Sequence, residues 1–202
     1  MTKAEFAARL HHACAAVTAA EAELTEIDSK FGDADHGLTM AKIAGAISAA
    51  VDASDSGIQA MLDDAAMAVM SLNGGSAVPL WNTWLDGMQE EAPEGDEIDV
   101  AGIQAIFAKA FEEIDDMSGA KVGDKTMMDA LIPASEAIAA YEGDSADELF
   151  AAAAKAATEG AENSKNFVSK FGRAKSYGTK TIGTPDAGAT SMSYFFQGLA
   201  RA

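Results

Sequence analysis

The chain has 202 residues, of which 49% are hydrophobic and 23% charged, proportions that fit a globular protein and exclude a disordered one. Acidic side chains outnumber basic ones by 32 to 14, giving a formal net charge of −18 at pH 7. This charge disfavours nucleic acids and membrane surfaces as partners, because both are anionic.

The cysteine content and the N-terminal residues indicate a cytoplasmic protein. The single cysteine, Cys14, cannot form an internal disulfide or a zinc–thiolate site. Charged side chains interrupt residues 1–16, which is untypical of a signal peptide. The sequence contains no run of about 18 apolar residues that would span a membrane.

Alanine-rich composition and helical spacing of apolar residues predict an all-α chain. Phe6, Leu10, Cys14 and Val17 recur at intervals of three or four residues, and alanine has the highest intrinsic helix propensity. No linker-like stretch divides the chain, so we expect residues 1–202 to form one domain. The predicted helices span residues 3–30, 37–53, 56–72, 77–91, 99–116, 124–142, 145–169 and 187–201.

Polar residues mark the starts of three of these helices. Ser54 or Ser56 is expected to cap the third helix, and Asp124 the sixth. Ser145 and Glu148 have the spacing of a capping box at the start of the seventh.

Glycine and polar residues concentrate in four of the breaks between helices, at residues 32–37, 73–79, 119–125 and 172–188. These are the first, third, fifth and seventh connections in chain order. In an antiparallel up-and-down bundle, alternate connections lie at the same end. The sequence therefore predicts one composite site at one end of the molecule.

The first of these segments has the composition of a magnesium site. Asp28, Asp33 and Asp35 place three carboxylates within eight residues, and hard divalent cations take oxygen ligands. The alternative is a solvated acidic turn with an aspartate helix cap. An EF-hand is excluded, because no carboxylate stands at the twelfth position. His36 can either contact a substrate or brace a carboxylate.

The second and fourth segments are suited to binding an anion. Gly74 and Gly75 precede a helix, whose N-terminal N–H groups attract phosphate, although an ordinary helix–helix turn has the same composition. The fourth segment carries Arg173 and is longer than a bundle normally needs, which favours a functional loop over a surface excursion.

The third segment contains G-D-K-T at residues 123–126, but it lacks the full P-loop spacing and no strand precedes it. A Walker-type nucleotide site is therefore excluded, and Lys125 and Thr126 are expected in the first turn of a helix. Taken together, three carboxylates, glycine-rich loops and one arginine indicate a metal–polyphosphate site, and phosphoryl transfer needs little more than such positioning and charge neutralisation.

Four motifs resemble one known family. They are G-D-A-D-H-G-L-T-M (32–40), G-D-K-T-M (123–127), G-R-A (172–174) and I-G-x-x-D-x-G-A-T-S (182–191). In this order they are similar to the nucleotide-binding L subunit of dihydroxyacetone kinase (DhaL), which is also the C-terminal domain of single-chain dihydroxyacetone kinases. The resemblance implies a closed barrel of eight antiparallel helices, with ADP or ATP and two Mg²⁺ ions bound at one end.

The resemblance also implies roles for individual residues. Asp28, Asp33 and Asp35 would hold the Mg²⁺ ions and would be catalytic together with Arg173. The implied nucleotide contacts are His36, Gly37, Leu38, Thr39, Ser76, Ala77, Gly119, Met127, Arg173, Asp186, Ala187 and Gly188.

The family's partners follow from the same resemblance. A separate K subunit holds a short ketose as a covalent hemiaminal, so this chain is expected to donate a phosphoryl group rather than to act as a complete kinase. The donor is either free ATP or bound ADP that a phosphotransferase-system subunit (the M subunit) rephosphorylates. In the alternative, the chain is a nucleotide-state sensor that binds a transcription regulator without catalysing transfer.

The second motif departs from the family pattern. G-G-A-S-G-P-L is usual, whereas residues 74–80 read G-G-S-A-V-P-L, with the hydroxyl moved to Ser76 and Val78 in place of a glycine. This puts a phosphate contact at Ala77 in doubt, and Ser76 can compensate. The departures fit a relative that acts on another ketose, such as a tetrulose, or a subunit with altered nucleotide exchange.

Overall fold

The regular structure of residues 1–201, which the computed structural model describes, is helical apart from an isolated bridge between Thr2 and Glu97. This confirms the all-α prediction. The α-helices are α1 (Lys3–Ala19), α2 (Glu21–Ser29), α3 (His36–Ala53), α4 (Ile58–Met70), α5 (Ala77–Glu90), α6 (Val100–Ser118), α7 (Met128–Ala139), α8 (Ala146–Asn163) and α9 (Ala187–Leu199), and two 3₁₀ segments, η1 (Ser164–Asn166) and η2 (Arg173–Thr181), lie between α8 and α9.

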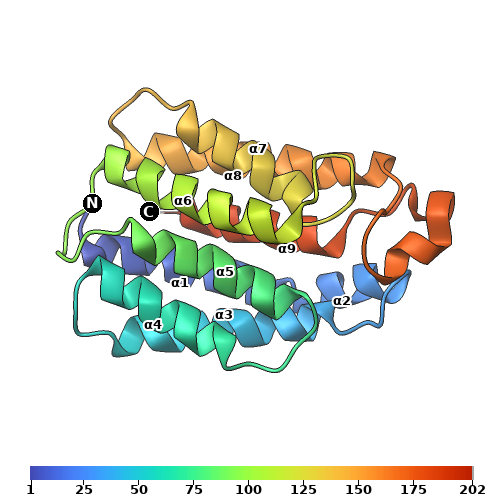
Figure 1. The fold of residues 1–202 in the computed structure, drawn as a ribbon, viewed down its shortest axis with the longest axis horizontal. Helices are drawn as coiled ribbons and strands as arrows, with labels where there is room; N and C mark the ends of the chain where they lie inside the picture. Colours follow the sequence, from blue (N-terminus) through green and yellow to red (C-terminus); the bar gives the residue numbers. More distant parts are fainter. Residues whose placement is uncertain (202) are drawn as a thin grey trace.

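The long helices run up and down in chain order and contact their neighbours in a ring (Figure 1). From α3 to α9 each packs against the next, and α1 closes the ring by packing against both α3 and α9. The short α2 contacts α3 and α9 at the end of the molecule that also carries η2. The closed barrel stays a prediction, with this order of contacts in its favour.

Aromatic side chains fill the space between the helices. Trp84 of α5 lies edge-on to the rings of Trp81, Phe107, Phe195 and Phe196, with centroids 5.5–6.0 Å apart. All five rings are buried, and burying a large apolar side chain contributes roughly 1.5–3 kcal/mol. The core therefore joins α5, α6 and α9 and fixes the ends of these helices relative to one another.

One glycine sets the spacing between the first and last helices. A Cβ atom at Gly198 would lie 2.2 Å from the Cα atom of Ala13, so α9 can approach α1 this closely only without a side chain at that position. The closure of the ring depends on this contact.

Two predicted helices are shorter or divided. The helix expected at residues 3–30 is interrupted at Ala20, whose φ of −89° and ψ of 3° separate α1 from α2. The helix expected at 145–169 ends at Asn163 and continues only as the 3₁₀ turn η1.

The predicted start of the sixth helix at Asp124 is wrong. Gly123 and Lys125 have φ angles of 97° and 61°, which no right-handed helix accommodates, and α7 begins only at Met128. Asp124 is not a helix cap, since its carboxylate accepts hydrogen bonds from the Lys121 N–H and the Lys170 ammonium.

Of the other two predicted caps, one forms and one does not. The Ser145 hydroxyl accepts a bond from the Glu148 N–H at 3.3 Å and so caps α8, but the reciprocal bond of a capping box is replaced, because the Ser145 N–H donates to the Tyr141 hydroxyl. The cap predicted at Ser54 or Ser56 is wrong, because Gly57 precedes α4 without a side-chain cap. Instead, the Lys3 ammonium binds the carbonyls of both serines.

Among residues 1–201, no helix combines the length and apolar character that crossing a membrane requires.

Candidate functional site

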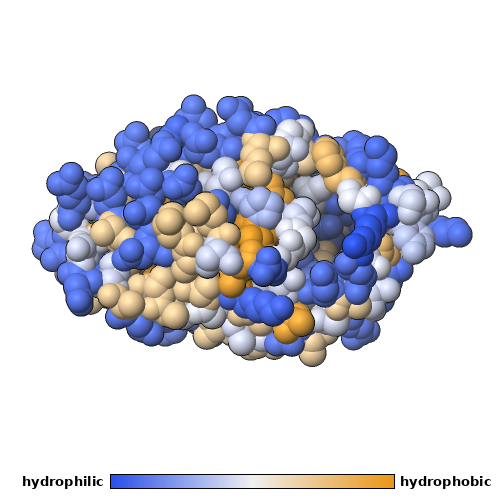
Figure 2. Space-filling view, turned by 60° about the horizontal axis from the view of Figure 1, so that its bottom comes forward, coloured by the Kyte–Doolittle hydropathy of each residue, from blue (hydrophilic) through white to orange (hydrophobic). Residues whose placement is uncertain are grey.

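The four glycine-rich segments meet at one end of the molecule, around a cavity of about 600 Å³. This confirms the convergence predicted from the alternation of the connections. Figure 2 shows the surface hollowed at this end, on the right of the view, with hydrophilic residues along its rim. The residues lining the cavity include Asp28, Asp33, Asp35, His36, Thr39, Ser76, Ala77, Met127, Arg173, Asp186, Ala187 and Gly188.

Three predicted nucleotide contacts lie outside this lining. Gly37 packs against α2, since a Cβ atom there would lie 2.1 Å from the carbonyl oxygen of Glu21. Leu38 is half exposed on the outer side of α3, and Gly119 ends α6 in a left-handed conformation with φ 62°. Their roles as nucleotide contacts stay predictions.

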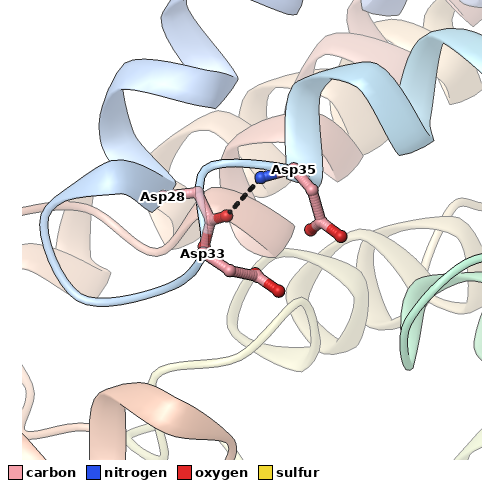
Figure 3. A group of neighbouring side chains, drawn as sticks. All are labelled: Asp28, Asp33 and Asp35. Carbon is pink, nitrogen blue, oxygen red and sulfur yellow. Dashed lines mark hydrogen bonds between the residues drawn. The ribbon is translucent and has the colours of Figure 1, made fainter.

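The turn between α2 and α3 brings the three aspartates together (Figure 3). The Asp28 carboxylate accepts hydrogen bonds from the N–H groups of Asp35, at 3.1 Å, and His36, at 3.4 Å, which folds the turn back onto the end of α2. One oxygen from each of Asp28, Asp33 and Asp35 lies within 4.8 Å of the others. The carboxylates of Asp33 and Asp35 point to the same side of the turn.

This turn depends on unusual backbone positions. A side chain at Gly32 would place its Cβ atom 1.9 Å from an Asp28 carboxylate oxygen, so only glycine fits. Ala34 has a φ of 61°, a left-handed conformation that costs a non-glycine residue roughly 1–3 kcal/mol. Such cost is typical of functional sites, where the surroundings hold the chain in place.

The charges of the three aspartates are incompletely balanced. Burial raises the pKa of Asp35, and the neighbouring Asp33 and Asp28 carboxylates raise it further, because like charges disfavour ionisation. Arg173 of η2 forms an ion pair with Asp33. An all-oxygen donor set with excess negative charge fits Mg²⁺, whose binding relieves the repulsion.

His36 is half-buried at the start of α3 and faces α9. Its Nε2 atom lies 3.1 Å from the Ser191 hydroxyl oxygen. Burial lowers the pKa of His36, and the Asp28 charge opposes this effect. The imidazole thus links the carboxylate turn to α9.

Two helices direct their N-termini at the cavity. Gly75, Ser76 and Ala77 line it where α5 begins, and no atom lies near the position that a Cβ of Gly75 would take. Asp186 precedes α9, and its carboxylate accepts a bond from the Ala189 N–H at 2.8 Å. Helix N-termini carry partial positive charge and attract phosphate groups.

The Asp186 carboxyl is half-buried where it lines the cavity, and the loss of water there raises its pKa to about 7. Nearby Asp129 raises the pKa as well, whereas the Lys125 charge and the hydrogen bond from Ala189 lower it. Asp186, a predicted nucleotide contact, also caps α9 through the bond from the Ala189 N–H, a role that the motif did not reveal.

Two buried charged residues, Lys125 of the G-D-K-T loop and Asp129 at the start of α7, hold this loop in place. Asp129, which is buried, accepts bonds from the N–H groups of Gly123 at 2.6 Å and Thr126 at 2.7 Å. Lys125, which is 4% exposed, donates from its ammonium to the carbonyls of Ser164 and Thr184. Lys125 was expected in the first turn of a helix, and no periodicity in the sequence indicates that either charge is buried.

Residues 30–201 match the model of a protein family described as the DAK2 domain. The chain belongs to the DAK2 domain family. The resemblance to DhaL is confirmed, because this DAK2 protein is 28% identical to the ADP-binding subunit DhaL of the PEP-dependent dihydroxyacetone kinase from Escherichia coli, over 94% of this chain and 92% of that one.

Other relatives of this DAK2 protein are longer kinases. It is 34% identical to a D-erythrulose kinase and 36% identical to an L-erythrulose 1-kinase, both from Mycolicibacterium smegmatis, over 88% and 89% of this chain. The matches cover 32% of each relative, so the chain spans about a third of the length of these enzymes.

The fold of the DAK2 protein matches that of a solved dihydroxyacetone kinase from C. freundii, which was crystallised with AMP-PNP and Mg²⁺. The TM-score is 0.73 at 24% sequence identity, and the match covers 98% of this chain and 33% of the other. This likeness establishes the fold.

Proposed function

We propose that this DAK2 protein is the nucleotide-binding, phosphoryl-donor subunit of a kinase for dihydroxyacetone or a related short ketose. The observation that carries the proposal is the juxtaposition of three carboxylates with Arg173 at a cavity that two helix N-termini face. In this proposal residues 1–202 act as one DhaL-type domain that binds ADP or ATP.

Asp28, Asp33 and Asp35 would hold two Mg²⁺ ions, which neutralise and orient the nucleotide phosphates when bound. The net charge of −18 makes such neutralisation necessary, since the protein's field otherwise repels a polyphosphate. Asp28 has a second task, because it also binds two backbone N–H groups of the turn. The turn therefore keeps its shape while its outer carboxylates face the cavity.

The remaining polar groups of the cavity suit phosphate oxygens. Ser76 lies at the start of α5 and has no side-chain hydrogen bond to the helix, so its hydroxyl is available where the usual family motif has one at the next position. Arg173 pairs with Asp33 at the cavity and can reach a transferred phosphoryl group from there. The cavity also has an apolar side suited to a base, lined by Leu80, Trp81, Met117, Ala120 and Met127.

A partner must supply the ketose. We assign the general base for the substrate hydroxyl to a K subunit that carries the ketose as a hemiaminal, as the resemblance to DhaL implies. Large exposed apolar side chains gather on the segments around the cavity and suit such a docking contact. They are Leu38, Met117, Val122, Phe171, Tyr177 and Ile182.

The relatives narrow the substrate class. Two of the matched enzymes are named for erythrulose, a four-carbon ketose, and the E. coli relative for dihydroxyacetone. Since the ketose would be bound by the K subunit, its identity is decided outside this chain. The donor, free ATP or an M subunit acting on bound ADP, is distinguished by the dissociation rate of ADP, which is fast in the first case and slow in the second.

The test is a thermal-shift titration with ADP and ATP, with and without Mg²⁺. Ligand at 100 times its Kd should stabilise the wild type by about 2.7 kcal/mol. The shift should require Mg²⁺ and disappear in Asp33→Ala, whereas Asp63→Ala, which removes an exposed carboxylate from α4, should retain it. Protein should first be denatured and refolded without nucleotide, and released ADP assayed, so that bound nucleotide does not mask the shift.

Turnover is then measured with a K subunit and its ketose. Asp33→Ala should abolish phosphoryl transfer and Asp63→Ala should not. A wild-type protein that, once freed of nucleotide, shows no Mg²⁺-dependent shift would overturn the proposal. If nucleotide binds but no K subunit supports transfer, while a regulator complex depends on nucleotide state, the sensor alternative replaces it.

A further inference from the structure

The G-D-K-T loop (residues 123–126) binds the long segment between α8 and α9 (residues 164–186) at two points, Lys170 and Thr184. At one end, the Lys170 N–H donates to the Asp124 carbonyl at 3.0 Å, and the Lys170 ammonium binds the Asp124 carboxylate at 2.6 Å. At the other end, the Lys125 ammonium donates to the Thr184 carbonyl at 2.5 Å. Arg173 lies on the part of the chain between these two points.

The Lys170 contact is exposed, whereas the Lys125 contact is buried. The Lys170 side chain is 61% exposed, so water competes for its bonds. The Lys125 side chain is buried and makes a second bond, at 2.6 Å, to the Ser164 carbonyl at the end of α8. Charge-assisted hydrogen bonds in a buried site are strong, and a buried ammonium without partners is costly.

Ser164 connects this contact to the start of α9. Its hydroxyl accepts a bond from the Asp186 N–H at 2.8 Å and donates to the Ala161 carbonyl at 2.6 Å. The Lys125 ammonium thus holds Thr184 and Ser164 together, and Ser164 holds Asp186. This chain of contacts ends at the Asp186–Gly188 turn, which lines the cavity.

The backbone conformation of Lys125 indicates that its side chain has a specific role. With a φ of 61°, this position would favour glycine or asparagine if only the turn mattered. Asp129 fixes the loop on either side of Lys125 by accepting bonds from Gly123 and Thr126. These two bonds hold the loop in a conformation that directs the Lys125 ammonium inward.

We propose that Lys125 is a positioning residue of the nucleotide site, whose buried ammonium fixes the 164–188 segment so that Arg173 and the Asp186–Gly188 turn face the carboxylate cluster. This rests on the proposed function, because it assigns those groups to the nucleotide. Lys125 is not itself a catalytic residue, since its bonds go to main-chain carbonyls of its own chain.

The first test uses hydrogen exchange on the free protein, with Lys125→Met as the variant. The amides of Gly183 and Asp186 should exchange at least tenfold faster than in the wild type, while amides of α5 and α6 keep their rates. Lys121→Met, which removes an exposed charge paired with Asp115 from the same loop, should change neither. Unchanged exchange at residues 164–188, or equal acceleration throughout the molecule, would overturn the proposal.

The second test measures the affinity for Mg²⁺–ADP by calorimetry. Lys125→Met should weaken binding at least tenfold. Ser164→Ala, which removes the bond from Asp186 and the bond to the Ala161 carbonyl but keeps the carbonyl that Lys125 binds, should weaken it less and accelerate exchange at Asp186. Wild-type affinity in Lys125→Met overturns the positioning role. If the wild type itself fails to bind, the proposed function falls, and the exchange measurement still decides whether Lys125 fixes the segment. If Lys125→Met does not fold, Lys125→Gln, whose shorter side chain cannot reach both carbonyls, decides by the same two readouts.

Discussion

Arg173 forms an ion pair with Asp33, a carboxylate that belongs to the cluster suited to Mg²⁺. The two residues are 140 positions apart in the sequence and come from opposite sides of the cavity. The guanidinium therefore lies where a metal ion would compete for the same oxygen. In the proposed function Arg173 leaves Asp33 for a phosphate oxygen when the metal–nucleotide complex binds.

Arg173→Gln should lower kcat for phosphoryl transfer by about 10²–10³, because it removes a charge directed at the transferred group. Its effect on the Kd for Mg²⁺–ADP should be smaller, since the loss of phosphate attraction is offset by the release of Asp33 from its ion pair. Steady-state kinetics with a K subunit and calorimetry measure the two quantities. Lys155→Gln, an equal loss of charge on the exposed side of α8, is the control, and equal kcat in both variants would contradict the role of Arg173.

The raised pKa of Asp186 should make stability depend on pH. Its pKa is about 7 in the folded protein, whereas an aspartate in the unfolded chain titrates near 3.9. Between about pH 4 and pH 7 the folded state holds a proton that the unfolded state has lost. From this group alone, stability is highest at the acid end and falls as pH rises, by up to about 1.4 kcal/mol per unit.

Asp186→Asn removes this titration and retains a residue suited to capping α9. Urea unfolding of the variant at pH 5, 6 and 7 should therefore show a flatter profile than that of the wild type. Asp124→Asn serves as the comparison. Hydrogen bonds from Lys170 and Lys121 lower the pKa of Asp124, so its loss should change the profile only at lower pH. Parallel profiles for Asp186→Asn and the wild type would be the contrary result.

Gly198→Ala should destabilise the protein by about 1–3 kcal/mol, because its Cβ atom would lie 2.2 Å from Ala13 and would force α9 away from α1. The start of α9 carries the Asp186–Gly188 turn, so nucleotide affinity should fall as well. Gly45→Ala on α3 is the matched control. No atom lies within 4 Å of its Cβ position, and replacing a helical glycine by alanine should stabilise by about 0.4–1 kcal/mol. Thermal or urea unfolding should show a lower free energy of unfolding for Gly198→Ala and a higher one for Gly45→Ala.

Apolar periodicity determined the helices well wherever one face of a helix is buried throughout. The spacing of Phe6, Leu10 and Cys14 predicted α1, and the same principle placed the body of every later helix. It failed at Ala20 and Asn163, because periodicity reports which side of the chain is buried and not whether the backbone continues straight. Periodicity also could not predict helix boundaries that depend on the φ angles of single residues, such as Gly123 and Lys125.

The sequence by itself predicted the class of site. Carboxylates spaced along one turn, glycine-rich segments at alternate connections and Arg173 in a chain short of positive charge sufficed to predict convergence at one end, on a site suited to a polyphosphate, because helix alternation fixes which connections share an end. The family motifs added the nucleotide and the metal.

Only the tertiary structure decided which charges are buried and what they hold. Lys125 and Asp129 look like surface residues in the sequence, and their burial arises from the packing of α7, α8 and α9 around them. The pairing of Arg173 with Asp33 likewise depends on how the 164–188 segment folds back across the end of the ring. Burial and long-range pairing depend on the whole chain, and no local pattern of residues encodes either of them.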